Sequence, residues 1–172
     1  MKTWRTGLTL AVCLGAGVAF GRAARAGDAP GLKSQLPSHA TRGALERVSG
    51  RVLLKLESEE CRRVFSDYAD AQGRLLQENL DALGLTPAGY LRTILFKDGR
   101  QHVRCRNPRV MAFTSPGSRV VFLCPTQFEN AARQNQVRTT AIVIHEAMHT
   151  LGLGENPPST EEITHGVLAR CY

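Results

Sequence analysis

The apolar positions of this chain change their spacing from one stretch to the next. Over residues 58–84, leucines recur at intervals of three and four residues, which is the spacing of one helix face. Gly73 interrupts this stretch, so the pattern predicts two helical pieces. An earlier apolar run, residues 52–56, fits an early strand or a short helix. A further short helix is expected over residues 86–91, where Pro87 takes the first helical position.

Between residues 93 and 124 the apolar positions recur every second residue, as they do in strands. Three short strands are predicted, over 94–96, 110–113 and 120–123. The turn residues 115–118 (Ser-Pro-Gly-Ser) join the last two strands into a hairpin. We therefore expect a small antiparallel sheet. The edge of such a sheet has unpaired backbone groups that can bind an extended chain as an added strand.

The pattern after the sheet is helical again. Residues 137–149 run without Gly or Pro, and Gly152 closes the predicted helix. Ser159 or Thr160 caps a last helix that runs to Cys171. This distribution predicts an α+β fold in a small single domain, with a short antiparallel sheet packed on the helix over 137–149 and a helix at the C-terminus.

The N-terminal residues show no such pattern of a packed domain. Residues 1–26 combine a basic start, an apolar stretch over 8–20 and the small-x-small site Ala24-Arg25-Ala26, which are the features of a secretory signal peptide. The apolar stretch is shorter than the roughly 20 residues needed to cross a bilayer. Residues 27–44 are rich in Gly, Pro and polar residues and are expected to form a flexible arm. The folded domain is therefore expected over 45–172, in a secreted or periplasmic protein with no membrane contact after leader cleavage.

The positive charge of the chain lies largely in this leader. The formal net charge is +7, but residues 1–26 hold four of the 22 basic residues and no acidic one, which leaves 18 basic against 15 acidic residues. Such a mild excess does not predict nucleic-acid binding. The densest basic cluster fits a solvated hairpin and comprises Arg100, Arg104, Arg106 and Arg109.

Four cysteines follow the leader: Cys61, Cys105, Cys124 and Cys171. In an exported protein an even count predicts two disulfides, with three possible connectivities. Cys105 and Cys124 flank the predicted hairpin, which favours a Cys105–Cys124 bond and leaves Cys61 to pair with Cys171. Clustered spacings such as C-x-x-C are absent, so structural disulfides are a better interpretation than zinc thiolates.

His145 and His149 lie four residues apart, and Glu146 directly follows the first. In a helix of about 3.6 residues per turn this spacing puts both imidazoles on one face, within reach of one metal ion. Glu146 projects about 100° round the helix, near enough to take a proton from water activated by the metal. The pattern predicts a Zn²⁺ site with Glu146 as general base. The competing interpretation is a core helix with a hydrogen-bonded histidine pair.

Two histidines need a further protein donor to make a zinc site. The sequence continues as His145-Glu146-x-x-His149-x-x-Gly152-x-x-Glu155. This resembles the metzincin zinc peptidases, whose motif is H-E-x-x-H-x-x-G-x-x followed by His or, in some members, an acidic residue. A left-handed Gly152 can end the helix and turn the chain back under the metal. The resemblance implies a zincin-like fold with zinc bound by His145, His149 and Glu155, and peptide hydrolysis with Glu146 as base.

The resemblance covers eleven residues and has one departure. No methionine follows Met148, so the Met-containing turn of the metzincins is missing. Residues 156–158 (Asn-Pro-Pro) stand there instead, and we expect them to be a stiff extended segment that fixes the approach of Glu155.

Other residues remain open for parts of the site. Glu161, Glu162 and His165 are alternative third ligands on the last predicted helix, although the two glutamates also suit the first turn of a helix. An oxyanion donor is usually needed as well, and His165 and Tyr172 are candidates for it.

The leader and the motif together predict a secreted zinc metalloendopeptidase that acts as a monomer on a peptide or protein substrate. Two alternatives stay open: a non-catalytic secreted zinc-binding or scaffold protein, and a metallo-hydrolase of cell-wall peptides.

Overall fold

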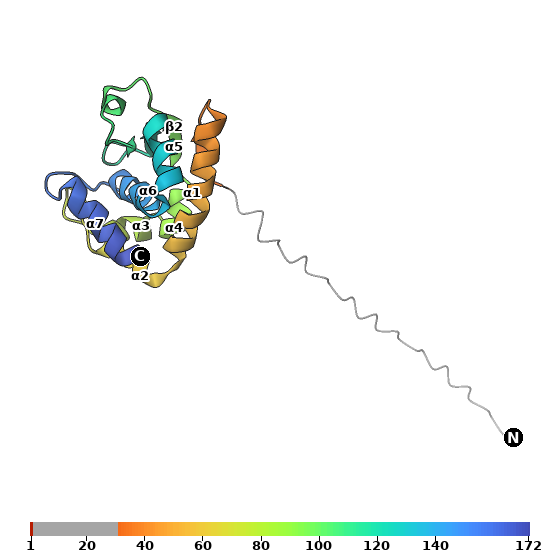
Figure 1. Cartoon of the computed structure of the whole chain (residues 1–172). Coiled ribbons are helices and arrows are strands. Elements are labelled where there is room, and N and C mark those ends of the chain that lie inside the picture. Colours follow the sequence, from red (N-terminus) through yellow and green to blue (C-terminus); the bar gives the residue numbers. More distant parts are fainter. Residues whose placement is uncertain (2–30) are drawn as a thin grey trace.

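The computed structural model describes Met1 and residues 31–172 of the chain. The predicted leader and the first residues of the predicted arm, up to residue 30, lie outside the described residues apart from Met1. The described part has mixed helix and sheet content in one small domain, so the predicted α+β class is confirmed. Figure 1 shows its helices grouped around α6 (Gln136–Thr150).

The other helical elements, in chain order, are α1 (His39–Glu57), α2 (Glu59–Arg62), the 3-10 turn η1 (Arg63–Ser66), α3 (Leu76–Ala82), α4 (Pro87–Leu91), the 3-10 turn η2 (Val103–Arg106), α5 (Pro125–Gln134) and α7 (Thr160–Cys171). The four strands are β1 (Lys33–Gln35), β2 (Leu95–Asp98), β3 (Ala112–Phe113) and β4 (Val120–Leu123).

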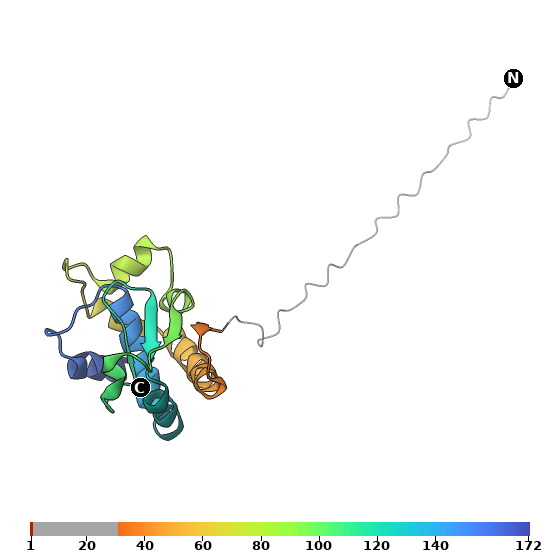
Figure 2. The ribbon, with the colours of Figure 1, turned by 90° about the horizontal axis from the view of Figure 1, so that it is seen from above.

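The strands form one sheet in the order β1-β2-β4-β3. Figure 2 shows β2 and β4 side by side near the middle of the molecule. β1 pairs with β2, and β2 with β4, in parallel, and β3 alone pairs antiparallel, with β4. The predicted antiparallel sheet is therefore wrong except for the hairpin. Apolar alternation shows where a strand lies in the sequence, but it does not show in which direction the strand runs relative to its neighbour. The connections between β1, β2 and β4 are long enough to return the chain to the other end of the sheet, so that these strands can pair in parallel.

Residues 33–44, expected to belong to a flexible arm, are instead part of the domain. Lys33–Gln35 form β1, and Leu36 and Ala44 are buried in the core. Ser38 caps α1 by accepting a hydrogen bond from the Thr41 N–H at 3.3 Å. The short polar strand has no apolar alternation because it lies at the edge of the sheet, and this hides it in the sequence.

The helical predictions for the first half of the domain are largely confirmed. Residues 52–56 lie within α1, which resolves the choice between helix and strand. The leucine-rich stretch is split into helical pieces on either side of Gly73, whose φ is 81°. α4 has Pro87 at its first position, as predicted, and the Thr86 side chain caps it by accepting from the Gly89 N–H. α5 was not predicted, although its two buried residues, Phe128 and Ala132, are spaced four apart as on one helix face.

α6 is the central helix of the domain. Residues 139–150 are all buried, because α6 packs against α1, α5 and α7 as well as against β3 and β4. In Figure 1 α7 lies on one side of α6 and α1 on the other. The polar side chains of a helix that is buried on every side have no access to water, so each needs a hydrogen-bond partner inside the protein.

Two disulfides join distant segments, and they are the predicted ones, Cys61–Cys171 and Cys105–Cys124. The first ties α2 to the end of α7, and the second ties η2 to the end of β4. Disulfides of this kind point to an oxidising, extracellular environment. In the described residues no helix has the length and apolar character needed to cross a membrane.

Candidate metal centre

His145 and His149 project from the same face of α6, as their spacing predicts. Their Nε2 atoms lie 2.9 Å apart. Both residues are buried, with 2% and 5% of their surface exposed. At this distance the two Nε2 atoms can share a hydrogen bond if one of them carries a proton, and they can bind one metal ion if both present a lone pair.

Gly152 brings Glu155 to the two histidines. Its φ is 110°, a backbone conformation that favours glycine, and α6 ends at this bend. Glu155 Oε1 lies 3.7 Å from His145 Nε2 and 3.5 Å from His149 Nε2. Asn156 also has a positive φ of 61°, and its N–H donates to the Pro158 carbonyl at 2.8 Å. The segment after Glu155 is therefore a turn, and the predicted extended conformation is wrong.

The three facing atoms fit a small metal ion. A triangle with sides of 2.9, 3.5 and 3.7 Å has a point about 2.0 Å from each corner, and zinc binds histidine nitrogen and carboxylate oxygen at about that length. His145, His149 and Glu155 also form a group that could hold a metal ion by the mutual distances of their donor atoms. Two nitrogens and one carboxylate oxygen suit several divalent metals, so the geometry leaves the identity of the metal open.

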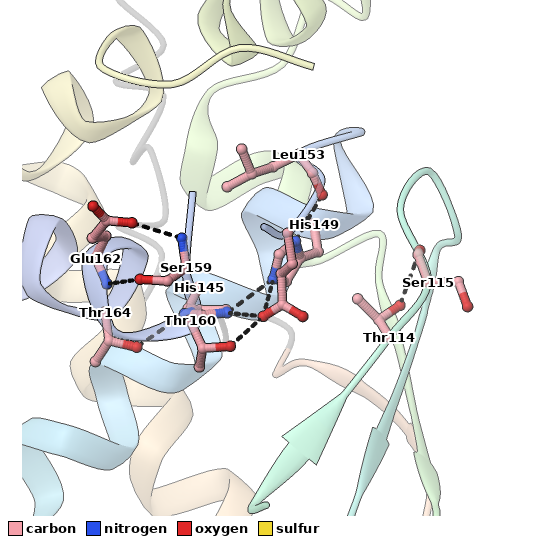
Figure 3. A network of polar contacts seen from close by, with 10 residues as sticks. Thr114, Ser115, His145, His149, Leu153, Ser159, Thr160, Glu162 and Thr164 are labelled. Atoms are coloured by element: carbon pink, nitrogen blue, oxygen red, sulfur yellow. Dashed lines mark hydrogen bonds and ion pairs between the residues drawn. The ribbon is translucent and has the colours of Figure 1, made fainter. Parts of the chain in front are cut away.

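Hydrogen bonds with neighbouring residues hold each donor residue in place (Figure 3). His145 Nδ1 lies 3.0 Å from the Thr164 hydroxyl, and His149 Nδ1 lies 2.7 Å from the Leu153 carbonyl. The Thr160 hydroxyl donates to Glu155 Oε1 at 2.6 Å. A carbonyl can only accept, so Nδ1 of His149 carries its proton and Nε2 is the nitrogen that faces the cluster.

Burial and charge set the protonation of the cluster. Burial, reinforced by the neighbouring His149, lowers the pKa of His145 to about 4, so this ring is neutral near neutral pH. Burial alone raises the pKa of Glu155, but the hydrogen bond from Thr160 and the nearby imidazoles outweigh it. The pKa of Glu155 therefore lies below its ordinary value. His145 and Glu155 are thus in the forms that bind a metal.

Glu146 lies outside the metal-binding group but is also buried, with 6% of its surface exposed. Its Oε2 has no hydrogen-bond partner in the described part of the chain. Burial, followed by repulsion from Glu155, raises the pKa of Glu146 to about 8, while Arg104 acts in the opposite direction. A buried carboxyl with an unpartnered oxygen and a raised pKa is typical of a catalytic acid or base.

The alternative ligands do not reach the cluster. Glu162 completes the cap of α7, since it accepts from the Ser159 N–H at 2.8 Å and donates its own N–H to the Ser159 hydroxyl at 3.2 Å. Glu161 and His165 are exposed on α7. Tyr172 is half-exposed at the C-terminus, with the Lys55 ammonium over its ring. Neither candidate oxyanion donor is brought to the metal-binding group.

Several supporting residues were missed by sequence reasoning. Thr160 and Thr164 lie four residues apart and so share a face of α7, but no motif marks them. Asn79 donates both to Asp70 Oδ2 at 3.0 Å and to the Leu151 carbonyl at 3.1 Å, and it thereby holds the bend after α6. Long-range contacts of this kind leave no periodic signal in the sequence.

The chain was compared with known protein families, curated proteins and solved structures. No protein-family model, curated protein or solved structure matches this chain. The interpretation of the site therefore depends on its own geometry and chemistry.

Proposed function

We propose that this protein is an exported zinc-dependent metallopeptidase, a divergent relative of the metzincins. The observation that carries the proposal is the convergence of His145 Nε2, His149 Nε2 and Glu155 Oε1, which together could hold a metal ion. Glu146, the next residue after the first histidine, supplies a buried carboxyl without a fixed partner. The two disulfides are consistent with export.

Zinc held by these three donors would supply the Lewis-acid chemistry that makes water nucleophilic near neutral pH and polarises a carbonyl. Glu146 takes a proton from the attacking water as the C–O bond forms, and it passes a proton to the leaving amine as the C–N bond then breaks. A bound cation would favour the ionised carboxylate of Glu146, which burial disfavours.

The sheet offers a docking edge for an extended substrate. β3 lies at the end of the strand order, so one side of it has no strand neighbour in the described sheet. The loop after β3 is attached to α6, because the Gly117 N–H donates to the His149 carbonyl at 2.9 Å. We propose that a peptide binds beside β3 as an added strand, with its scissile bond near Glu146.

Glu146→Gln tests the mechanism. We expect the zinc content to stay at that of the wild type while peptide hydrolysis falls by at least about 100-fold, because the substitution removes the base but none of the metal-binding donors. Turnover of casein and of short quenched peptides, together with metal analysis of the purified protein, measures both quantities. Glu161→Gln, on the exposed face of α7, is the matched control and should leave both unchanged.

The outcomes separate the alternatives. Full activity in Glu146→Gln would contradict the mechanism. Stoichiometric zinc in a wild-type protein that hydrolyses no peptide would favour the non-catalytic zinc-binding or scaffold alternative. Turnover of muropeptides but not of casein would favour a cell-wall hydrolase. Loss of activity on chelation and its recovery with zinc, compared with other divalent metals, would identify the metal.

A further inference from the structure

The η2 loop fixes Arg104 in position near the metal centre. Cys105, the next residue, is joined by a disulfide to Cys124 at the end of β4. The Gln127 side chain donates to the Cys105 carbonyl at 2.8 Å, and the Arg104 N–H donates to His102 Nδ1 at 3.2 Å. The backbone of Arg104 is therefore anchored on both sides, although its residue surface is exposed.

The side chain of Arg104 lies over the edge strand. Its guanidinium is 5.7 Å from the ring centroid of Phe113, which belongs to β3. That ring is itself held by Phe122 at 5.3 Å and by His102 at 4.6 Å. Because β3 packs against α6 and its following loop bonds to His149, this arrangement puts a cation on the same side of the domain as the candidate active site.

The guanidinium is not neutralised by an ion pair with any carboxylate of the described residues. Arg100, in the same loop, is paired with Asp98 at 2.8 Å. The guanidinium lies close enough to Glu146 and Glu155 for its positive charge to reach both carboxylates. Among the described residues, Arg106 and Arg109 have no comparable contact with an aromatic ring.

We propose that Arg104 binds an acidic group of the substrate next to the scissile bond, so that the enzyme prefers peptides with Asp or Glu near the cleavage site. This inference rests on the proposed function. A planar guanidinium held over an aromatic ring presents its N–H groups in the fork that matches a carboxylate. With no internal partner, Arg104 has no ion pair to break before it binds one.

Matched quenched peptides test the preference. Peptides that differ only in Glu, Gln or Lys at each position flanking the scissile bond are compared by kcat/KM with the zinc-loaded protein. At one position we expect Glu to exceed Gln by about three- to tenfold and Lys to be poorest. The difference should shrink as ionic strength rises, because the contact is exposed.

Arg104→Gln should remove the preference, so that the Glu and Gln peptides are cleaved with the same kcat/KM. Arg109→Gln is the matched control from the same loop and should retain the wild-type preference. Equal slowing of the Glu and Gln peptides by Arg104→Gln, or equal wild-type rates on both peptides, would overturn the inference.

A binding measurement separates this inference from the proposed function. Fluorescent Glu and Gln peptides are titrated against zinc-loaded Glu146→Gln and against Glu146→Gln combined with Arg104→Gln. Arg104-dependent selective binding of the Glu peptide supports the inference even if the wild type hydrolyses nothing. Cleavage by the wild type without any such selectivity supports the peptidase and overturns the role of Arg104.

Discussion

Both ring nitrogens of His149 have a defined neighbour, and this fixes its chemistry. Nδ1 donates to the Leu153 carbonyl, so Nε2 is the nitrogen that faces His145 and Glu155. His145 has a hydroxyl at the corresponding place, that of Thr164. Outer hydrogen bonds of this type orient a metal-bound imidazole and raise its basicity. Thr164 is therefore a positioning residue for the metal centre.

Thr164→Val should weaken zinc binding by about 10- to 100-fold, because the hydroxyl that orients His145 is replaced by a methyl group. Thr164→Ser keeps the hydroxyl and should restore most of the affinity. Competition with a chromogenic chelator measures the dissociation constants. Wild-type affinity in the valine variant would show that Thr164 has no part in positioning His145.

At the scale of elements, the site depends on how α6 ends. The C-terminal end of α6 and the bend at Gly152 carry Glu155 back to the two histidines. The bend is fixed from outside, because Asn79 of α3 donates to the Leu151 carbonyl. It is also tightly packed: a Cβ at Gly152 would lie 3.0 Å from the Cβ of Asp70.

Gly152→Ala should lower the free energy of unfolding by about 1–3 kcal/mol, because a side chain is strained at a φ of 110° and meets Asp70. We also expect weaker zinc binding, since Glu155 would be displaced. Denaturant unfolding and zinc titration measure the two effects. Gly154→Ala is the matched control, because its Cβ would meet nothing within 4 Å. Equal effects of the two substitutions would exclude a special role of the bend.

At the scale of the whole molecule, Asp70 ties the loop before α3 to Asn79 of α3, and Asn79 in turn donates to the Leu151 carbonyl at the end of α6. It accepts hydrogen bonds from Asn79 at 3.0 Å, from the Arg74 side chain at 3.2 Å and from the backbone N–H groups of Gln72 and Arg74 at 2.9 and 3.0 Å. The hydrogen bond from Asn79, with those from Arg74 and Gln72, lowers the pKa of Asp70 to about 2. Its role is structural, as a turn residue that accepts from the backbone N–H groups that follow it.

The lowered pKa of Asp70 predicts part of the acid sensitivity of the fold. Because the folded state binds this proton less readily than the unfolded state, Asp70 stabilises the fold above about pH 4 and loses that contribution as the pH falls towards 2. Asp70→Asn should therefore lower the melting temperature of the zinc-free protein at pH 7. The difference from the wild type should shrink between pH 4 and 2. Glu78→Gln, on the exposed side of α3, should show no such dependence.

The sequence by itself determined what depends on nearby residues. The i, i+4 spacing of His145 and His149, the helix stop at Gly152 and the caps at Thr86 and Ser159 are consequences of helix geometry over a few residues. The disulfide pairing followed from the small number of cysteines and the predicted hairpin. The full motif also gave Glu155 as the preferred third ligand, ahead of the acids of α7.

The tertiary structure decided what depends on distant residues. The parallel pairing of β1, β2 and β4 is set by how the long connections cross, and apolar alternation contains no information on direction. The support of the imidazoles by Thr164 and Leu153, the hold of Asn79 on the end of α6 and the position of Arg104 over β3 need backbone segments brought together by packing. In one sequence the partners of such a contact look like unrelated polar residues, because a hydrogen bond between distant segments requires no fixed spacing along the chain.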